Sequence, residues 1–373
     1  MGVKLNSIEV KRQNRKRIFR YLLKADTVTK QEISFQLRLS LPTVSQILSE
    51  LGAAGLVYEA GMQASSGGRR AVTVCADGEA RLAAGIDITK NHVDFAMINL
   101  RGEILVNERM RKTFSQSEAY GLELKEMHRE FLKKHRIDEK KITGLGVSLP
   151  GIVSEDQKVL QYSHILGLKE PMPFGTIDLP YEIRFFNDAT AACMAECYTH
   201  TAPPSFTFLS LSNSVGGATV FQNQIVMGDN SRSGELGHMC LVPGGRPCYC
   251  GKAGHYDAYG SALVLLNLTN GSMSEFFERL EKREPHFVQV FDEYLEFLAL
   301  MIYNLHIQSD LPVVIGGYVG SYLKPYVNIL KEKVEGYSIF EEQKEYIYLC
   351  NYNVEAAAVG AARYFTEKFI ENI

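Results

Sequence analysis

Four side chains that commonly bind metals lie within eighteen residues near the middle of the chain. His238, Cys248, Cys250 and His255 supply two imidazoles and two thiols. Zn²⁺ takes four such nitrogen and sulfur ligands in a closed tetrahedral site, and the intervening glycines let the backbone turn tightly enough to bring them together. Because four protein ligands leave no position for water, the pattern predicts a structural Zn²⁺ rather than a catalytic one.

A carboxylate precedes the first predicted metal ligand. The segment Gly234–His238 reads Gly-Glu-Leu-Gly-His, which places Glu235 one tight turn before His238. Taken singly, a Cys-x-Cys pair can arise by chance and a histidine is usually an ordinary polar group. Four candidates interleaved with glycines favour a metal site that fixes this loop so that Glu235 can contact a ligand.

The net charge of −3 conceals a basic N-terminal region. Residues 1–75 contain twelve Lys and Arg against five Asp and Glu, which gives +7, and the rest of the chain carries −10. A small basic region on an acidic body predicts a polyanionic partner for that region.

The basic region, predicted as a domain over residues 1–80, has the pattern of a winged helix-turn-helix. Apolar residues at helical spacing predict a first helix over 9–24. Thr29 and Glu32 have the spacing of a capping box, which starts a second helix. Ser40 is the predicted N-cap of a third helix.

The third helix and the segment after it supply the predicted DNA contacts. Apolar residues from Val44 to Leu51 should face the core, which leaves short polar side chains outward to meet base edges in the major groove. Strands predicted over 55–59 and 71–74 flank a basic, glycine-rich wing suited to phosphates or the minor groove. A small helical domain with a solvated basic face is the alternative. The predicted DNA-binding residues are Pro42, Thr43, Ser45, Gln46, Ser49, Arg69 and Arg70.

Residues 81–373 alternate between predicted strands and helices, which indicates an α/β body of two lobes. We expect one lobe over 81–200, completed by a C-terminal helix within 353–373, and a second lobe with the zinc site over 201–352. The predicted strands are 83–88, 93–100, 142–148, 183–186, 206–211 and 312–315, and the main helices are 188–198, 257–268, 287–308 and 354–369.

Turns follow several of these strands, at Leu149–Gly151, Asn187–Asp188 and Gly316–Gly317. Ligands bind at the carboxyl ends of strands in open α/β sheets, so these turns are candidate binding positions. Asp188 also stands where a helix should begin, so a capping role is its alternative.

These segments together resemble the ROK family, which comprises repressors and sugar kinases. Family members carry Gly-Glu-x-Gly-His and then Cys-x-Cys-Gly-x-x-Gly-Cys-x-Glu. Residues 234–238 and 248–257 have the same spacing, with His255 in place of a cysteine and Asp257 in place of the glutamate. The resemblance covers nearly the whole chain. It implies a two-lobed body of the actin/hexokinase (ribonuclease H-like) fold behind the winged helix-turn-helix.

The resemblance also implies a sugar pocket. His238 would bind zinc through one nitrogen and hydrogen-bond the sugar through the other. Asp188 occupies the position of the base that activates the sugar hydroxyl in the family's kinases. The implied sugar-binding residues are Gly151, Asn187, Asp188, Glu235, His238 and Asp257.

The two loops that hold ATP phosphates in the kinases differ in this chain. The usual Asp-x-Gly-Gly-Thr reads Asp-Ile-Thr-Lys-Asn at 87–91, and the usual Gly-Thr-Gly-x-Gly becomes Ser212–Gly217, which keeps only the last part. Phosphoryl transfer depends on positioning and charge stabilisation, so we predict that the chain is not an enzyme. Family members often have Asn-Leu-x-x-Trp where 163–168 lie here, and the chain contains no Trp, so the sugar stays unidentified.

The sequence therefore predicts a sugar-responsive transcriptional repressor. We expect operator DNA and a sugar or sugar phosphate as partners, Zn²⁺ as structural cofactor, and a homodimer or dimer of dimers. One alternative is an ATP-dependent sugar kinase with a DNA-binding region, and another is a regulator controlled by a protein such as a sugar-transport component. Seven cysteines fit a reducing cytoplasm, and no apolar run predicts a membrane span or signal peptide.

Overall fold

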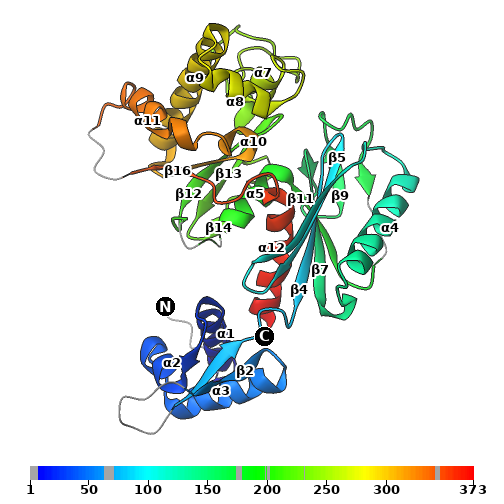
Figure 1. Ribbon diagram of the computed structural model, residues 1–373, viewed down its shortest axis with the longest axis vertical. Helices are drawn as coiled ribbons and strands as arrows, with labels where there is room; N and C mark the ends of the chain where they lie inside the picture. Colours follow the sequence, from blue (N-terminus) through cyan, green and yellow to red (C-terminus); the bar gives the residue numbers. More distant parts are fainter. Residues whose placement is uncertain are drawn as a thin grey trace.

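The computed structural model describes residues 7–62, 71–173, 179–197, 199, 202–230, 232–340 and 345–373. Figure 1 shows an N-terminal part in blue below two larger parts, each of which contains its own sheet. The predicted wing residues Arg69 and Arg70 lie outside the described residues. Among the helices that are described, none combines the length and apolar character needed to cross a membrane.

The N-terminal part is a winged helix-turn-helix of three helices and a three-stranded sheet of order β1-β3-β2. Its apolar core includes Ile18, Ile33, Val44 and Leu51, so the predicted inner face of the third helix is confirmed. The elements are α1 (Ser7–Lys24), β1 (Val28–Thr29), α2 (Lys30–Leu37), α3 (Leu41–Ala53), β2 (Val57–Met62) and β3 (Val72–Ala76).

Both predicted helix starts are present in this part. Thr29 accepts the backbone N–H of Glu32, and the Glu32 side chain accepts the backbone N–H of Thr29, which completes the capping box of α2. Ser40 accepts the backbone N–H of Thr43 at 3.3 Å and caps α3. The two-residue strand β1 was not predicted, because it is too short to show an alternating pattern.

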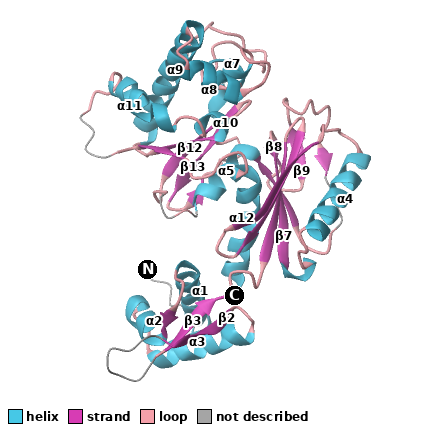
Figure 2. Ribbon diagram, in the orientation of Figure 1, coloured by secondary structure: helices cyan, strands magenta, loops and turns pink. Residues whose placement is uncertain are grey.

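The first lobe is built on a five-stranded sheet of order β11-β7-β4-β5-β6. Helices α12 (Ala356–Asn372) and α4 (Glu118–Lys134) cover its opposite faces (Figure 2). Because alternate residues of β4 point to opposite faces, Ala83 packs with α12, and Leu82 and Ile86 pack with α4. The elements are β4 (Leu82–Ile88), β5 (His92–Asn99), β6 (Ile104–Arg111), α4 (Glu118–Lys134), β7 (Ile142–Leu149) and β11 (Ile183–Asn187); β8 (Ile152–Val153), β9 (Val159–Tyr162) and β10 (Met172–Pro173) form a small antiparallel sheet beside them.

The second lobe is built on a five-stranded sheet of order β14-β13-β12-β15-β16. Its helices gather around the long helix α9, whose Phe291, Leu298 and Met301 lie in the largest apolar core. The elements are β12 (Phe206–Leu211), β13 (Val215–Phe221), β14 (Gln224–Ile225), η2 (Leu236–His238), α6 (Asp257–Gly260), α7 (Leu263–Leu266), α8 (Met273–Glu281), α9 (Pro285–Ser309), β15 (Val313–Gly316), α10 (Gly317–Gly320), α11 (Val327–Glu335) and β16 (Ile347–Leu349).

Helices α5 (Asp188–Cys197) and α12 (Ala356–Asn372) lie side by side between the two sheets (Figure 1). Their backbones approach so closely that a Cβ on Gly360 would lie 1.7 Å from the carbonyl oxygen of Ala191. Apolar residues of both helices also pack with Phe208 and Ala218 of the second sheet. The C-terminal helix therefore connects the two lobes.

The helix predicted over 257–268 is wrong as a single element. It is broken into α6 and α7, because Ser261 has an extended backbone with ψ of 155°. The N–H of Ala262 then donates to the carbonyl of Ser212 at 2.8 Å instead of continuing the helix. The break ties this segment to the loop between β12 and β13.

Among the body strands that the structure describes, the sequence prediction missed seven: β6, β8, β9, β10, β13, β14 and β16. β6 is an edge strand with alternating exposed positions and several charged residues, so its apolar signal is weak. β13 contains Gly216 and Gly217, which lower the strand signal. A Cβ on Gly217 would lie 2.3 Å from the carbonyl oxygen of Phe208, so the close packing against β12 requires glycine there.

Candidate ligand cavity and metal centre

A cavity of about 1120 Å³ lies between the two lobes. Its walls include five of the six residues predicted to bind a sugar: Gly151, Asn187, Asp188, Glu235 and His238. The first three come from the ends of β7 and β11, and the last two come from the turn around η2. Residues separated by up to 87 positions in the chain thus share one site.

Asn187 and Asp188 have different tasks at the start of α5. The side chain of Asn187 accepts the N–H of Thr190 at 3.0 Å and donates to the carbonyl of Gly151 at 3.1 Å. Asn187 therefore caps the helix and holds the ends of two strands together. Asp188 follows it and accepts the N–H of Ala189 at 2.9 Å, and burial raises its pKa. Its carboxyl group lines the cavity.

Glu235 faces Asp188 from the second lobe. Burial raises the pKa of Glu235 first, and the nearby charge of Asp188 raises it further. The Glu235 Oε2 atom lies 3.8 Å from Nε2 of His238. Two carboxyl groups, an imidazole and an amide around one cavity form a set of donors and acceptors suited to a ligand with several hydroxyl groups.

Asp257 does not line this cavity. Its Oδ1 accepts the backbone N–H of Val215 at 2.6 Å, and only 4% of the residue is exposed. Burial raises the Asp257 pKa to about 6, against the opposite effect of the Val215 hydrogen bond. Its short side chain holds Val215, the first residue of β13, so a contact between Asp257 and a ligand stays a prediction.

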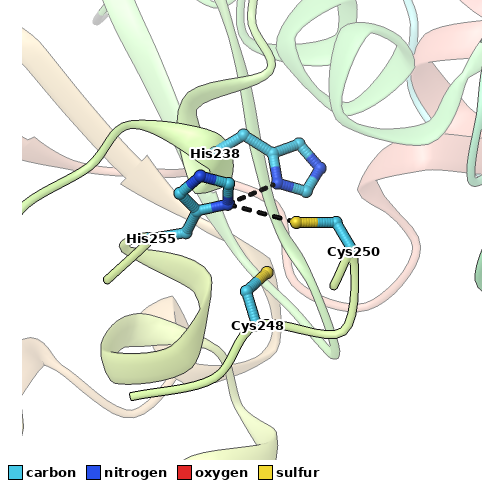
Figure 3. Close-up of side chains that lie close together, drawn as sticks. All are labelled: His238, Cys248, Cys250 and His255. Atoms are coloured by element: carbon cyan, nitrogen blue, oxygen red, sulfur yellow. Dashed lines mark hydrogen bonds between the residues drawn. The ribbon is translucent and has the colours of Figure 1, made fainter. Parts of the chain in front are cut away.

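The four predicted metal ligands converge at the edge of the cavity (Figure 3). One ligand atom from each of His238, Cys248, Cys250 and His255 lies within 4.8 Å of all the others. The His238 and His255 Nδ1 atoms are 3.4 Å apart, and Cys250 Sγ is 3.2 Å from His255 Nδ1. The edges of a tetrahedral zinc site measure about 3.3–3.8 Å, so the cluster can hold a metal ion.

Glycines let residues 248–255, which we call the metal loop, turn back on themselves. Gly251 and Gly254 have φ of +83° and +81°, a region that favours glycine. A Cβ on Gly254 would lie 1.9 Å from the carbonyl oxygen of Val242. Cys248 donates its N–H to the carbonyl of Lys252 at 2.8 Å, which closes the turn between the two cysteines and His255.

The residues that line the cavity without having been predicted include three with aromatic rings, Tyr249, His164 and Tyr364. Tyr249 lies between the two cysteines, His164 follows β9, and Tyr364 belongs to α12. The position of Tyr249 within the metal motif was the one local signal that could have indicated a role. Nothing in the local sequence around Tyr364 places it beside cavity residues such as His255, which is 109 positions away.

The predicted DNA-binding residues of the third helix lie within the first nine positions of α3. Pro42, Gln46 and Ser49 are exposed, and Thr43 and Ser45 are partly exposed. Gln46 donates to Glu50 at 3.2 Å, and Glu50 also pairs with Lys11 at 2.6 Å and with Arg15. The outward face of α3 is therefore polar and available for contacts, as its pattern predicts.

A winged helix-turn-helix joined to a two-lobed α/β body with a polar cavity defines a class of DNA-binding proteins that respond to small molecules. Residues 83–368 match the model of the ROK family, and the chain belongs to that family.

The chain is similar to both regulators and kinases. It is 26% identical to the xylose repressor of Bacillus subtilis (strain 168) over 261 residues, which cover 69% of this chain and 68% of the repressor. A ROK family transcriptional regulator described as a homologue of Escherichia coli MLC superposes with a TM-score of 0.77 at 18% identity, over 97% of each chain. A ROK glucokinase from Streptomyces griseus, solved with glucose and AMPPNP, has a TM-score of 0.65 at 20% identity and covers 75% of this chain and 98% of its own.

Proposed function

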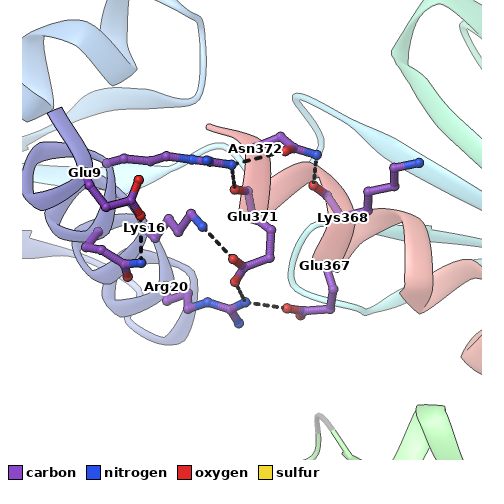
Figure 4. Close-up of polar contacts among 9 residues, drawn as sticks. Glu9, Lys16, Arg20, Glu367, Lys368, Glu371 and Asn372 are labelled. Atoms are coloured by element: carbon purple, nitrogen blue, oxygen red, sulfur yellow. Dashed lines mark hydrogen bonds and ion pairs between the residues drawn. The ribbon is translucent and has the colours of Figure 1, made fainter. Parts of the chain in front are cut away.

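We propose that this chain is a transcriptional repressor that binds operator DNA through its winged helix-turn-helix and releases it when a sugar enters the cavity. One observation carries this proposal: helix α12 reaches from the cavity to the DNA-binding part. Tyr364 lines the cavity, and Glu367 and Glu371 of the same helix contact α1 (Figure 4). Membership of a family that includes a xylose repressor supports the proposal.

The contact between α12 and α1 is a network of ion pairs. The Arg20 guanidinium lies 2.7 Å from Glu367 and 2.9 Å from Glu371, and Lys16 lies 2.5 Å from Glu371 (Figure 4). Arg12 donates to the backbone carbonyl of Glu371 at 2.7 Å. Basic residues of α1 that would otherwise face solvent are thus paired within the protein.

A second contact comes from the first lobe. Arg101, in the turn between β5 and β6, donates to the backbone carbonyls of Leu23, Ala25 and Ala76. Leu100 and Ile370 also join the apolar core of the DNA-binding part. The position of that part is therefore sensitive to movement of α12 and of the first sheet.

Sugar binding supplies a reason for such movement. Asp188 begins α5 and Tyr364 lies on α12, so a ligand that contacts both bears on the two helices that lie between the lobes. A change of lobe angle would alter the placement of the DNA-binding parts in a homodimer on a two-fold operator. Coupling of this kind requires that DNA and sugar weaken each other's binding by the same factor.

We further propose that the His/Cys cluster holds a structural Zn²⁺. His238 would bind it through Nδ1, which leaves Nε2 directed toward Glu235 and the cavity. The ion would fix the loop that carries the cavity-lining residues Tyr249 and Lys252. The alternative to release by a sugar is that a sugar-transport protein binds this chain and releases it from DNA.

Kinase activity is the alternative that the cavity-lining carboxyl group of Asp188 favours, because an aspartate there can accept a hydroxyl proton. We propose that phosphoryl transfer does not occur, because the first phosphate loop lacks glycine. There, Thr89 Oγ1 accepts the N–H of His92 at 3.0 Å, so the side chain closes the turn after β4. A coupled assay for ADP release over a panel of sugars would detect a kinase.

The proposed function is tested by a gel-shift titration on DNA upstream of this protein's own gene and of neighbouring operons. The titration is repeated with free and phosphorylated sugars. We expect a specific shift that one sugar releases. A specific shift that no sugar releases would favour control by a protein partner, and the absence of any specific shift would contradict the repressor function.

A further inference from the structure

Tyr249 and His164 meet across the cavity from opposite lobes. Tyr249 belongs to the metal loop of the second lobe, and His164 follows β9 in the first lobe. Their rings are stacked, with centroids 4.9 Å apart and planes 29° apart. We call this pair the aromatic wall. It is a contact between the two lobes at the boundary of the ligand cavity.

The first-lobe side of the aromatic wall is held by a buried serine. Ser163 is 1% exposed, and its hydroxyl donates to the carbonyl of Pro150 at 2.5 Å and accepts the N–H of Leu166 at 3.1 Å. These bonds fix the turn that carries His164 to the end of β7. The backbone that leads into His164 is therefore fixed beside Gly151, against which Ser163 packs.

The second-lobe side is held by the metal loop. The Tyr249 hydroxyl lies 3.2 Å from Nε2 of His238, and the two rings are T-shaped with centroids 5.4 Å apart. Because Cys248 and Cys250 flank Tyr249, the proposed metal would restrain its backbone on both sides. Tyr249 cannot leave His238 without also breaking its stack on His164.

His238 has one nitrogen left for a ligand. Its Nδ1 faces the metal cluster, so an imidazole bound there keeps its hydrogen on Nε2 and donates one hydrogen bond. Glu235 lies 3.8 Å from that Nε2 atom, and the Tyr249 hydroxyl oxygen lies 3.2 Å from it. A ligand group that reaches Nε2 must therefore fit between Glu235 and the ring of Tyr249.

This inference rests on the sugar-binding function proposed above. We propose that the aromatic wall determines specificity: it accepts an uncharged monosaccharide with a hydroxyl group toward His238 and excludes sugars with an acylamino or phosphate group there. A ligand hydroxyl can share the Nε2 hydrogen with the Tyr249 oxygen while the ring stays in place, but a larger planar group requires the ring to move. A phosphate would in addition meet the carboxylates of Asp188 and Glu235, which repel it.

The test is isothermal titration calorimetry of the full chain, loaded with zinc, against D-xylose, D-glucose, N-acetyl-D-glucosamine and D-glucose 6-phosphate. We expect the parent to bind a neutral, unsubstituted sugar about tenfold or more tightly than either substituted one. Tyr249→Ala should reduce the discrimination against the N-acetyl sugar to about threefold or less, because it opens room beside His238. The same variant should not improve the binding of D-glucose 6-phosphate, because the carboxylates of Asp188 and Glu235 remain.

Two further variants separate the effect of the Tyr249 ring from that of its hydroxyl group and from that of losing any aromatic ring. Tyr249→Phe keeps the ring and should keep the discrimination. Phe221→Ala removes an exposed aromatic ring of the second lobe that does not line the cavity, and it should leave the ratio of affinities unchanged. Zinc content and DNA binding establish that each variant is folded. Tighter binding of a substituted sugar by the parent, or an unchanged ratio in Tyr249→Ala, would overturn the proposal. Failure of every sugar to bind or to release DNA would instead overturn the proposed function.

Discussion

At the scale of single residues, the buried carboxyl group of Asp87 is costly to ionise in the folded protein. It lies in β4 opposite Ser148 of β7, is 8% exposed, and accepts the Ser148 hydroxyl. Burial raises the Asp87 pKa to about 7, and the Ser148 hydrogen bond only partly opposes that effect. The carboxyl group thus resists ionisation in the folded protein but ionises freely when the chain unfolds.

We predict that Asp87→Asn stabilises the protein at pH 7.5 much more than at pH 4. With a folded pKa above the unfolded value, the stability that Asp87 contributes is complete below about pH 4 and is lost as the pH rises through about 7. The upper bound of this loss is about 4 kcal/mol, since one pKa unit corresponds to about 1.4 kcal/mol. Urea unfolding of both proteins across this pH range measures it.

Asp26→Asn, at an exposed position of the DNA-binding part, is the matched control for this change. It should leave the pH dependence of unfolding as it is in the parent. If Asp87→Asn follows the parent curve at every pH, the carboxyl group is not protonated in the folded protein.

Among the metal ligands, Cys250 allows a direct test. Cys250→Ser replaces the proposed thiolate ligand by a hydroxyl group, which binds zinc weakly. The amount of zinc bound per chain should therefore fall about tenfold or more, and the melting temperature should fall with it. Metal analysis after dialysis and a thermal melt measure both. Cys240→Ser is the control, because Cys240 is exposed and lies outside the cluster. Equal zinc in the two variants would remove Cys250 from the site.

At the scale of elements, the contact between α5 and α12 depends on Gly360. A Cβ there would meet the Ala191 carbonyl at 1.7 Å, and backbone atoms cannot give way as a side chain can. Gly360→Ala should therefore destabilise the protein by about 1–3 kcal/mol or more, although alanine is the better helix former. Chemical denaturation gives the value.

The comparison for Gly360 is Gly52, in α3. A Cβ on Gly52 would have its nearest contact at 3.6 Å, an ordinary van der Waals distance. Gly52→Ala should be neutral or stabilising by up to about 1 kcal/mol. Similar losses in both variants would mean that the close approach of α5 and α12 relaxes easily.

At the scale of the whole molecule, the ion pairs between α12 and α1 should carry the effect of the sugar to the DNA-binding part. In a Glu367→Gln and Glu371→Gln double variant, we expect the ratio of DNA affinities without and with sugar to fall about threefold to tenfold. Each partly exposed pair is worth about 0.2–1 kcal/mol, and Arg20 and Lys16 lose their partners together. Fluorescence anisotropy with labelled operator DNA measures the ratio.

The control is a Glu332→Gln and Glu335→Gln double variant. These two exposed acids lie on α11, so their substitution removes the same charge away from the DNA-binding part. Raising the salt concentration should weaken the coupling in the parent more than in the α12 variant, because exposed pairs are screened. A parent-like response of the α12 variant to sugar would show that another contact, such as that of Arg101, transmits the change.

The sequence alone determined the features that depend on neighbouring residues. Capping at Thr29 and Ser40, the buried face of α3 and most of the central strands follow from side-chain periodicity and local hydrogen bonding. The His/Cys cluster was predictable for the same reason, because its four side chains lie on one short, glycine-rich segment. Family membership followed from those motifs.

Only the tertiary structure decided which distant segments share the site. Packing of α12 between the lobes brings Tyr364 to the cavity and Glu371 to α1, and neither contact has a local signal. The same holds for His164 opposite Tyr249, and for Asp257, whose carboxylate turns to the N–H of Val215 instead of the cavity. These outcomes depend on distances set by the whole fold, because short-range patterns specify elements but not how the elements pack.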